Sequence, residues 1–445
     1  MRIVIAGAGE VGTHLAKLLS KEGLDVTLID PEESKLRVVD SNYNLMTLTG
    51  SPTAFKVLKA ANVEEADLYI AVTPFETRNI VSCTMAKKLG AKKTVARIDN
   101  NEFLKEEYTP FFQKLGVDNL IYPEHFASAE IQLALENSWA RSWFELYNGE
   151  LLLVGVKLRE NAKLIGMQLK QLAMGGHSFH VSAIRRRHET IIPRGDDHIE
   201  VGDIVYFTTQ REYLKDIIDI AGKQVQHIRR VLIMGGSRIG VQIARLLDDS
   251  YRIKIIESDK DKCLKLVEKV PSNCVVVNGD GRDLELLREE GISDYDAFIA
   301  LTDSSETNIL ACLTAKEFGV RKTIAEVENI QFIAEAENLN IGRIINKKLL
   351  ASSNIFQILL DFDSSNAKCL ALTDAEVAEL VVKEGSKITK APVKDLHLSL
   401  DMTIGGLIRN NKGMLVNGDT EIQAGDHVLI FGLTGTIHKI EKMFK

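Results

Sequence analysis

The sequence contains one glycine-rich motif whose residue types and spacing suit phosphate binding: Gly7, Ala8, Gly9, Glu10, Val11 and Gly12. In such a GxGxxG pattern the first glycine permits a tight turn and the second lets the backbone approach a pyrophosphate. The third allows close packing of helix on strand. The motif follows a short apolar strand and opens a helix, whose free N–H groups and positive dipole end attract phosphate. It therefore predicts a dinucleotide-binding loop.

A carboxylate follows the motif at the expected distance. Asp30 lies 23 residues after Gly7 (30 − 7 = 23), at the end of the next predicted strand. An acid near this spacing binds the adenosine ribose hydroxyls, and its charge repels a 2′-phosphate. The pattern favours NAD(H), or adenine nucleotides such as ATP and ADP, over NADP(H). The alternative role for Asp30 is to cap a turn.

The chain repeats itself over a long period. Residues 79–96 read NIVSCTMAKKLGAKKTVA and residues 308–325 read NILACLTAKEFGVRKTIA, at a constant offset of 229 (308 − 79). Nine of these eighteen positions are identical, which shared helix propensity does not explain. The period is far longer than that of a solenoid repeat, so we infer tandem duplication of whole domains.

A smaller unit is duplicated as well. The segment 193–203, ending in Gly202-Asp203, resembles the segment 416–426, ending in Gly425-Asp426. The order is therefore a large unit, a small unit, a large unit and a small unit. We place the four predicted domains at 1–140, 141–226, 227–365 and 366–445.

The two kinds of unit have different hydrophobic patterns. In the large unit, short apolar strands alternate with helical patterns, which predicts an α/β fold with a doubly wound, Rossmann-like parallel sheet. Strands are expected at Ile3–Ala6, Val26–Ile29, Leu68–Val72 and Thr94–Ile98, and helices at Gly12–Lys21 and Ile80–Leu89. The small unit has strands separated by turn residues and one later helix, which predicts a compact α+β module.

The second large unit departs from the glycine motif. Its corresponding residues are Gly235, Gly236, Ser237, Arg238, Ile239 and Gly240. Ser237 replaces the central glycine and adds a Cβ and a hydroxyl, while Arg238 replaces Glu10 and favours an anion. Glu257 stands where the first large unit, called copy one from here on, has Asp30. The second large unit, copy two, thus retains a carboxylate for ribose. We expect nucleotide binding here too, and the ligand need not be the same in both copies.

Further candidate site residues follow the later strands, because ligands of open parallel sheets bind outside the carboxyl ends of the strands. In copy one these are Gly50, Ser51, Thr73 and Pro74, and in copy two they are Gly279, Asp280, Thr302 and Asp303. Arg97 follows another strand of copy one and is either a phosphate ligand or part of a surface salt bridge. Its counterpart in copy two is Glu326, so only copy one carries this cation.

Composition excludes several functional classes. A net charge of −7 argues against a nucleic-acid partner, because phosphate neutralisation needs a clustered basic surface. The cysteines form no CxxC pair and are expected to be reduced, mostly as small core residues. No apolar run approaches the roughly 18 residues that span a bilayer, and the start of the chain reads as a strand rather than a signal peptide.

No catalytic constellation accompanies the glycine motifs. The sequence has no GxxxxGK[ST], HExxH or GxSxG motif, and its histidines are scattered. A dehydrogenase needs a proton-transfer group and a substrate anchor beside the nicotinamide. We therefore predict a ligand-sensing protein with no catalytic or metal site. The alternatives are an NAD-dependent oxidoreductase with a degenerate second Rossmann domain and a sensor coupled to another ion system.

Over nearly its whole length the chain resembles TrkA-type regulators of Trk potassium uptake, whose units are called RCK or KTN domains. The resemblance rests on the glycine motif with Asp30, on the segments around Asn79 and Asn308, and on the two small units ending in Gly202-Asp203 and Gly425-Asp426. The alternating order of large and small units is its most specific element.

The resemblance implies a function and a location. The large units would be RCK N-terminal domains that bind NAD(H) or ATP/ADP, and the small units would be RCK C-terminal regulatory domains. The protein would be peripheral on the cytoplasmic face of a bacterial inner membrane, where it gates a Trk-type potassium channel. It would form a homo-oligomer, a dimer whose four Rossmann units make a ring.

Overall fold

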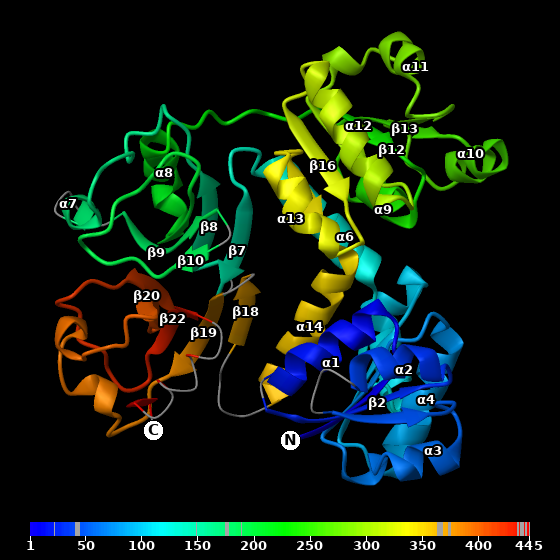
Figure 1. The fold of residues 1–445 in the computed structure, drawn as a ribbon, viewed down its shortest axis with the longest axis horizontal. Helices are drawn as coiled ribbons and strands as arrows, with labels where there is room; N and C mark the ends of the chain where they lie inside the picture. Colours follow the sequence, from blue (N-terminus) through cyan, green and yellow to red (C-terminus); the bar gives the residue numbers. More distant parts are fainter. Residues whose placement is uncertain are drawn as a thin grey trace. The chain divides into compact units, whose positions relative to one another are not determined.

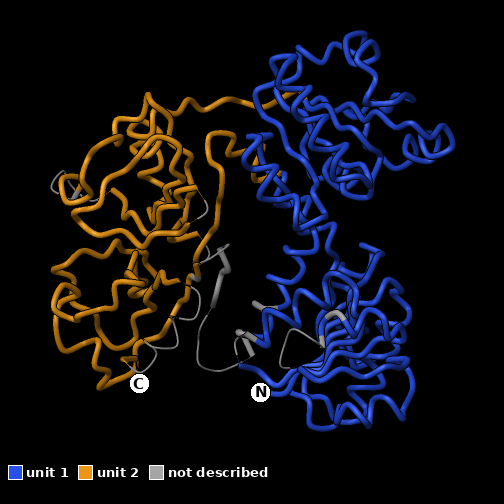
Figure 2. Tube along the Cα trace, viewed as in Figure 1, with its two compact units in different colours: residues 1–131, 231–359 blue, residues 132–230, 360–445 orange. Residues whose placement is uncertain are grey.

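The computed structural model describes residues 1–21, 23–40, 45–147, 149–173, 178–187, 189–362, 368–372, 375–433, 436, 440, 443 and 444. The chain divides into two compact units, coloured separately in Figure 2. Unit 1 comprises Met1–Ile131 and Val231–Leu359, and unit 2 comprises Gln132–Arg230 and Leu360–Lys445. Each unit thus combines matching segments from the two halves of the chain.

Copy one of unit 1 is a six-stranded parallel sheet in the order β3-β2-β1-β4-β5-β6. Its strands are β1 (Arg2–Ala6), β2 (Asp25–Asp30), β3 (Met46–Thr49), β4 (Leu68–Ala71), β5 (Lys93–Arg97) and β6 (Asn119–Ile121). Its helices are α1 (Glu10–Lys21), α2 (Glu33–Asp40), α3 (Phe55–Ala60), α4 (Glu76–Leu89), α5 (Thr109–Leu115) and α6 (Pro123–Glu136). Every residue of β4 is buried, as expected for a central parallel strand covered on both faces.

Copy two repeats this topology, with the strand order β14-β13-β12-β15-β16-β17 (green to yellow in Figure 1). Its strands are β12 (Arg230–Met234), β13 (Arg252–Glu257), β14 (Cys274–Asn278), β15 (Ala297–Ala300), β16 (Lys322–Glu326) and β17 (Arg343–Ile345). Its helices are α9 (Arg238–Leu246), α10 (Lys260–Val267), α11 (Leu284–Glu289), α12 (Ser305–Glu317), α13 (Gln331–Asn338) and α14 (Lys347–Phe362). The predicted doubly wound, Rossmann-like fold is confirmed for both copies.

Unit 2 contains two five-stranded sheets of the same antiparallel topology, in the orders β10-β9-β11-β8-β7 and β21-β20-β22-β19-β18. The first is built from β7 (Ser142–Leu146), β8 (Leu151–Lys157), β9 (Phe179–Arg186), β10 (Glu189–Ile191) and β11 (Ile204–Thr209), with α7 (Leu169–Ala173) and α8 (Leu214–Ile220). The second is built from β18 (Lys368–Leu372), β19 (Ala375–Val381), β20 (Met402–Arg409), β21 (Lys412–Leu415) and β22 (His427–Leu433). The small units are thus the α+β modules that the sequence predicts.

The repeated Gly-Asp pairs of unit 2 have a structural role. The Asp203 carboxylate is almost fully buried and receives two hydrogen bonds from Arg186, at 3.0 and 2.8 Å. Asp426 is bound by Arg409 in the same way, at 2.9 and 2.6 Å. A buried aspartate needs such a bidentate partner, because an unpaired charge in the interior is costly. The Arg186 side chain therefore anchors a turn.

The described cysteines fit the prediction of small core residues. Cys83, Cys263, Cys274 and Cys312 are buried and free, and burial raises the pKa of the Cys274 thiol to about 11. The side chain of Cys369 lies outside the described residues. Such thiols remain protonated at neutral pH and pack as small apolar groups.

Candidate functional site

The glycine motif of copy one is shaped largely by backbone packing. A Cβ on Gly12 would lie 1.8 Å from the carbonyl oxygen of Gly7, and one on Gly7 would lie 3.0 Å from the Thr73 nitrogen. Gly7 also has a positive φ of 111°, which other residues rarely adopt. A Cβ on Gly9 would meet nothing within 4 Å. The protein's own packing does not require glycine there, so the open space above Gly9 is available to a ligand.

The two predicted ribose carboxylates hold their own glycine loops. Asp30 accepts hydrogen bonds from the backbone N–H groups of Ala8, at 2.7 Å, and Glu32, at 2.9 Å. Glu257 accepts them from Gly236, at 2.9 Å, and from Asp259, at 3.0 Å. A carboxylate has about four acceptor positions. Glu257 also accepts from Ser258 Oγ at 3.3 Å and pairs with Lys262, so a ribose hydroxyl would replace one of its present contacts. These acids thus orient their glycine loops, and Glu257 also lines a cavity.

Glu257 is poised to stay ionised. Burial opposes its ionisation, but hydrogen bonds from Asp259 N, the Lys262 ammonium and Gly236 N outweigh burial, and its pKa is lowered. Lys262 Nζ lies 2.7 Å from Glu257 Oε2. An ionised carboxylate accepts strong hydrogen bonds from ribose hydroxyls and disfavours a 2′-phosphate, as the sequence predicts.

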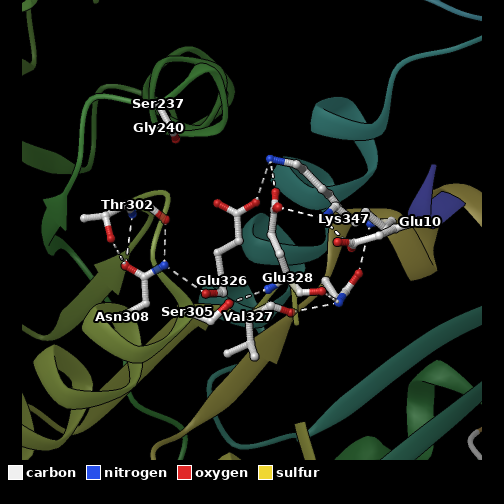
Figure 3. Close-up of polar contacts among 12 residues, drawn as sticks. Glu10, Ser237, Gly240, Thr302, Ser305, Asn308, Glu326, Val327, Glu328 and Lys347 are labelled. Carbon is white, nitrogen blue, oxygen red and sulfur yellow. Dashed lines mark hydrogen bonds and ion pairs between the residues drawn. The ribbon is translucent and has the colours of Figure 1, made fainter. Parts of the chain in front are cut away.

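An asparagine fixes the loop after the central strand in each copy. The Asn79 Nδ2 group donates to the carbonyl oxygens of Thr73 and Arg97, both at 2.9 Å, while its Oδ1 accepts from Thr73 N at 3.0 Å and Thr73 Oγ1 at 2.6 Å. Asn308 makes the equivalent contacts with Thr302 and Glu326, as Figure 3 shows. This buried amide ties the ends of two neighbouring strands together at the ligand-facing edge of the sheet.

A cavity of about 910 Å³ lies over the glycine loop of copy two. Eight of the candidate residues predicted for copy two line it: Gly235, Ser237, Arg238, Ile239, Glu257, Asp280, Thr302 and Asp303. Glu326 and Lys347 line it as well, whereas Gly279 does not. The cavity therefore extends from the ribose carboxylate on β13 past the glycine loop to the ends of β15 and β16. Its volume suits a nucleotide.

The other copy completes this cavity. Its lining includes Asp99 and Asn101, which follow β5 of copy one, and Tyr122 and Glu124, at the start of α6. Burial raises the pKa of Tyr122 to about 12, so its phenol remains a hydrogen-bond donor. Sequence analysis misses all four residues because they act on the opposite copy. Of the four, only Glu124 carries a signal in its own segment, since its counterpart in copy two is Lys348.

The fourth residue of each glycine motif forms an ion pair with the opposite copy. Arg238 Nη1 lies 3.2 Å from Asp99 Oδ1 of copy one, and Lys348 Nζ of copy two pairs with Glu10 of copy one. The charges at the two equivalent positions are reversed, and each is neutralised across the interface. The sequence predicts Glu10 and Arg238 as cofactor-binding residues, and in the structure both also link the copies.

The candidate residues of copy one gather at one edge of its sheet. Gly50 N donates to Asp30 O at 3.0 Å, and the parallel register aligns Ala6 with both Ile29 and Ala71. Ser51 and Pro74 are exposed at this edge, and Val11 is buried in the first turn of α1. Arg97 Nη2 lies 3.4 Å from Asp99, while its buried Nε has no hydrogen-bond partner. Arg97 is therefore in a salt bridge and still retains an unused donor.

Ser237 acts as a helix cap. Its hydroxyl accepts a hydrogen bond from Gly240 N at 3.3 Å, at the beginning of α9. Gly9, the equivalent residue in copy one, has no side chain for such a cap. The cap occupies one of the free N–H groups that a phosphate would otherwise use, so the two helix N-termini offer different surfaces to a ligand.

Across the part of the chain that the structure describes, no helix has both the length and the apolar character needed to cross a membrane. Within the same residues, no group of three or more His, Cys, Asp or Glu side chains is arranged to hold a metal ion.

Family models match most of the chain. The TrkA-N domain model matches residues 3–123 and 231–347, and the TrkA-C domain model matches residues 153–222 and 377–445. The chain belongs to the TrkA family. Among its relatives, the Trk system potassium uptake protein TrkA homolog 1 of Methanosarcina mazei is 31% identical over the full length of both chains. The TrkA homolog of Archaeoglobus fulgidus is 32% identical over the full length of both.

Solved structures share the fold of this TrkA family member. The GsuK RCK domain has a TM-score of 0.63 at 14% identity and covers 100% of this chain and 94% of its own. The GsuK channel bound to NAD has a TM-score of 0.63 at 14% identity. The match covers 100% of this chain and 78% of the GsuK chain. GsuK bound to ADP has a TM-score of 0.51 at 13% identity. The match covers 80% of this chain and 69% of the GsuK chain. The likeness extends over both units, and the RCK fold is thereby confirmed.

Proposed function

We propose that this TrkA family member is a cytoplasmic, nucleotide-binding regulatory subunit that gates a Trk-type membrane potassium channel. The observation that carries the proposal is the cavity of about 910 Å³ over the glycine loop of copy two, with the ionised Glu257 at one end. Full-length relatives named Trk system potassium uptake proteins support the transport role. The ligands we propose are NAD(H) and ATP or ADP, and GsuK structures with NAD and with ADP support both classes.

The mechanism we propose is a shift between two arrangements of a ring. The ring would be a homo-oligomer, a dimer whose four Rossmann units surround an axis on the inner face of the membrane. A ligand changes such an equilibrium only when it binds the two arrangements with different affinity. The cavity of copy two is lined by both copies, so any movement of one copy against the other changes the site. That geometry gives a nucleotide the differential contacts that gating requires.

We also propose the predicted site residues of both copies as ligand contacts, and the domain limits 1–140, 141–226, 227–365 and 366–445. The segments matched by the TrkA-N and TrkA-C models all fall inside these limits, which supports the division. A regulator is favoured over the NAD-dependent oxidoreductase because the relatives that match the full chain are named as transport proteins. Sustained NADH oxidation by the purified chain with a carbonyl or hydroxyl substrate would favour the enzyme instead.

Calorimetric titration of the full-length chain with NADH, NAD, ATP and ADP tests the binding part of the proposal. We expect micromolar binding of at least one nucleotide, and Glu257→Ala should weaken binding at copy two about tenfold, the loss of roughly one charge-assisted hydrogen bond. Glu289→Ala is a matched control, because Glu289 is exposed on α11 and does not line the cavity. If none of the four nucleotides binds, the sensing function is wrong.

Potassium flux tests the gating part. Proteoliposomes that contain a Trk-type channel should conduct potassium at a rate that changes when the chain and a nucleotide are added together. Glu257→Ala should shift the nucleotide concentration needed for this change. A flux that is independent of the chain at every nucleotide concentration would refute the gating role while leaving nucleotide binding intact.

A further inference from the structure

The far end of the copy two cavity contains two buried carboxylates from different copies. Glu326 is the last residue of β16, and Glu124 lies in the first turn of α6 of copy one. They are 4% and 6% exposed, and both line the cavity. The Glu124 Oε2 atom is buried without a hydrogen-bond partner. An acceptor that is buried and unsatisfied costs stability, so a donor supplied by a ligand would find a favourable partner here.

The lysine beside these carboxylates is already neutralised. Lys347 Nζ lies 3.1 Å from Glu326 Oε1 and also pairs with Glu328, as Figure 3 shows. The adjacent Lys348 is shared in turn between Glu328 and Glu10. Each lysine thus has two carboxylate partners, and the charge of Glu124 is not compensated by either ion pair. The far end of the cavity therefore favours neutral hydrogen-bond donors over a further anion.

Copy one has the opposite chemistry at the same position. Arg97 aligns with Ile121 in the pairing of β5 with β6, and Glu326 aligns with Ile345 in the pairing of β16 with β17. Arg97 and Glu326 are therefore equivalent strand ends. The buried Nε of Arg97 has no hydrogen-bond partner, so copy one has an unused donor where copy two has buried acceptors. A guanidinium group suits a phosphate.

A dinucleotide would reach this end of the cavity. Ligands of a doubly wound sheet lie across the point where the strand order reverses, here from β13 over the glycine loop toward β15 and β16. With adenosine at Glu257 and the pyrophosphate over the glycine loop, the remaining half lies against Thr302, Glu326 and Glu124. That half is a ribose with a carboxamide-bearing ring in NAD(H), and a negatively charged terminal phosphate in ATP.

We propose that the two sites of one chain select different nucleotides. Copy two takes a nicotinamide dinucleotide, whose ribose hydroxyls and carboxamide donate to Glu124 and Glu326. Copy one takes an adenine nucleotide, whose terminal phosphate is bound by Arg97. The proposal rests on the proposed nucleotide-binding function and adds the ligand class of each site.

Competitive calorimetry on the full-length chain tests the selectivity of copy two. In the Asp30→Ala background, which impairs copy one, NADH should bind at least about tenfold more tightly than ATP. Glu124→Gln removes the uncompensated charge and should reduce this preference about tenfold, or about 1.4 kcal/mol. Glu326→Gln is a second variant, and it should also reduce the preference for NADH. Here the cause is tighter ATP binding, because Lys347 then has only Glu328 as a partner. Glu102→Gln is the matched control, since this exposed carboxylate does not line the cavity, and it should leave the preference unchanged.

The reciprocal experiment tests copy one. In the Glu257→Ala background, Arg97→Gln should weaken ATP and ADP about tenfold and leave NADH unchanged. The selectivity proposal is overturned if nucleotides bind but neither Glu124→Gln nor Glu326→Gln changes the ratio of NADH to ATP affinity. If no nucleotide binds the unmodified chain, the proposed function itself fails, and the two failures are thereby distinguished.

Discussion

The two Rossmann-like copies of unit 1 share their backbone-directed contacts and differ in their ligand-facing side chains. Asn79 and Asn308 make the same set of hydrogen bonds, and Asp30 and Glu257 both hold the second residue of their glycine loops. In contrast, two charges are reversed between the copies. Copy two has Arg238 in place of Glu10, and Glu326 in place of Arg97. The duplicated fold thus preserves these backbone contacts, while the charges at the equivalent helix and strand ends have diverged.

The largest expected difference between the copies concerns the last glycine of each motif. Gly12→Ala should destabilise copy one by about 3 kcal/mol, because the new Cβ would lie 1.8 Å from the Gly7 oxygen. Gly240→Ala should change stability by less than about 1 kcal/mol, since its Cβ would lie 3.2 Å from the Gly235 oxygen and alanine is the better helix former. Urea unfolding of both variants measures the contrast, and equal losses would show that the two loops are packed alike.

The asparagine contacts should be equivalent in the two copies. Asn79→Ala and Asn308→Ala should each destabilise the chain by about 2 kcal/mol, because each leaves buried backbone groups without partners. Thermal unfolding measures both, with Asn79→Asp and Asn308→Asp as variants that keep the acceptor and lose the donor. A loss in one copy only would contradict the view that these contacts are common to both.

The stability of copy two should depend on pH through the buried Glu326, whereas copy one has Arg97 at the equivalent position. Burial raises the pKa of Glu326, with Lys347 acting in the opposite direction. A raised pKa means that the folded state binds the proton more tightly than the unfolded chain does. The stabilisation by this group is therefore present below its unfolded pKa and is lost as pH rises through its folded pKa. Glu326→Gln should flatten this part of the stability profile, measured by urea unfolding across acidic pH. An unchanged profile would contradict the prediction.

The reciprocal ion pairs should have the smallest effect on stability. Arg238→Ala and Glu10→Ala should each cost less than about 1 kcal/mol, because both side chains are largely exposed to solvent. A double-mutant cycle of Glu10 with Lys348 should give a coupling of about 0.5 kcal/mol that decreases in high salt. A coupling that is insensitive to salt would show that packing, and not charge, joins the copies at these residues.

The fold was predictable from the sequence because its signals are local and are repeated. The apolar strands, the glycine motif and the offset of 229 between the repeats all lie within short segments, and each appears twice. The position of Asp30 and Glu257 beside their glycine loops was likewise predictable from their spacing. Glu124, Asp99 and Lys348 were not, because each acts on the copy that it does not belong to. One usable signal was a charge reversal between the copies. When Ile121 is aligned with Ile345, Glu124 of copy one corresponds to Lys348 of copy two.

The partner of each ligand-facing charge also could not be predicted. The sequence leaves open whether Arg97 binds phosphate or forms a salt bridge, and in the structure it has a salt bridge to Asp99 and an unused Nε. Ser237 adds a hydroxyl at the central position of its motif, and in the structure this hydroxyl caps α9. Both outcomes depend on side-chain geometry, which residue type and spacing leave open.

The most direct test of two unlike nucleotide sites is a structure of the full-length chain crystallised with NADH and ADP together. The account predicts NADH in copy two, with its nicotinamide half against Glu124 and Glu326, and ADP in copy one, with its terminal phosphate at Arg97. The same nucleotide in both copies would contradict the divergence of the sites, and two empty glycine loops would contradict the sensing function as a whole.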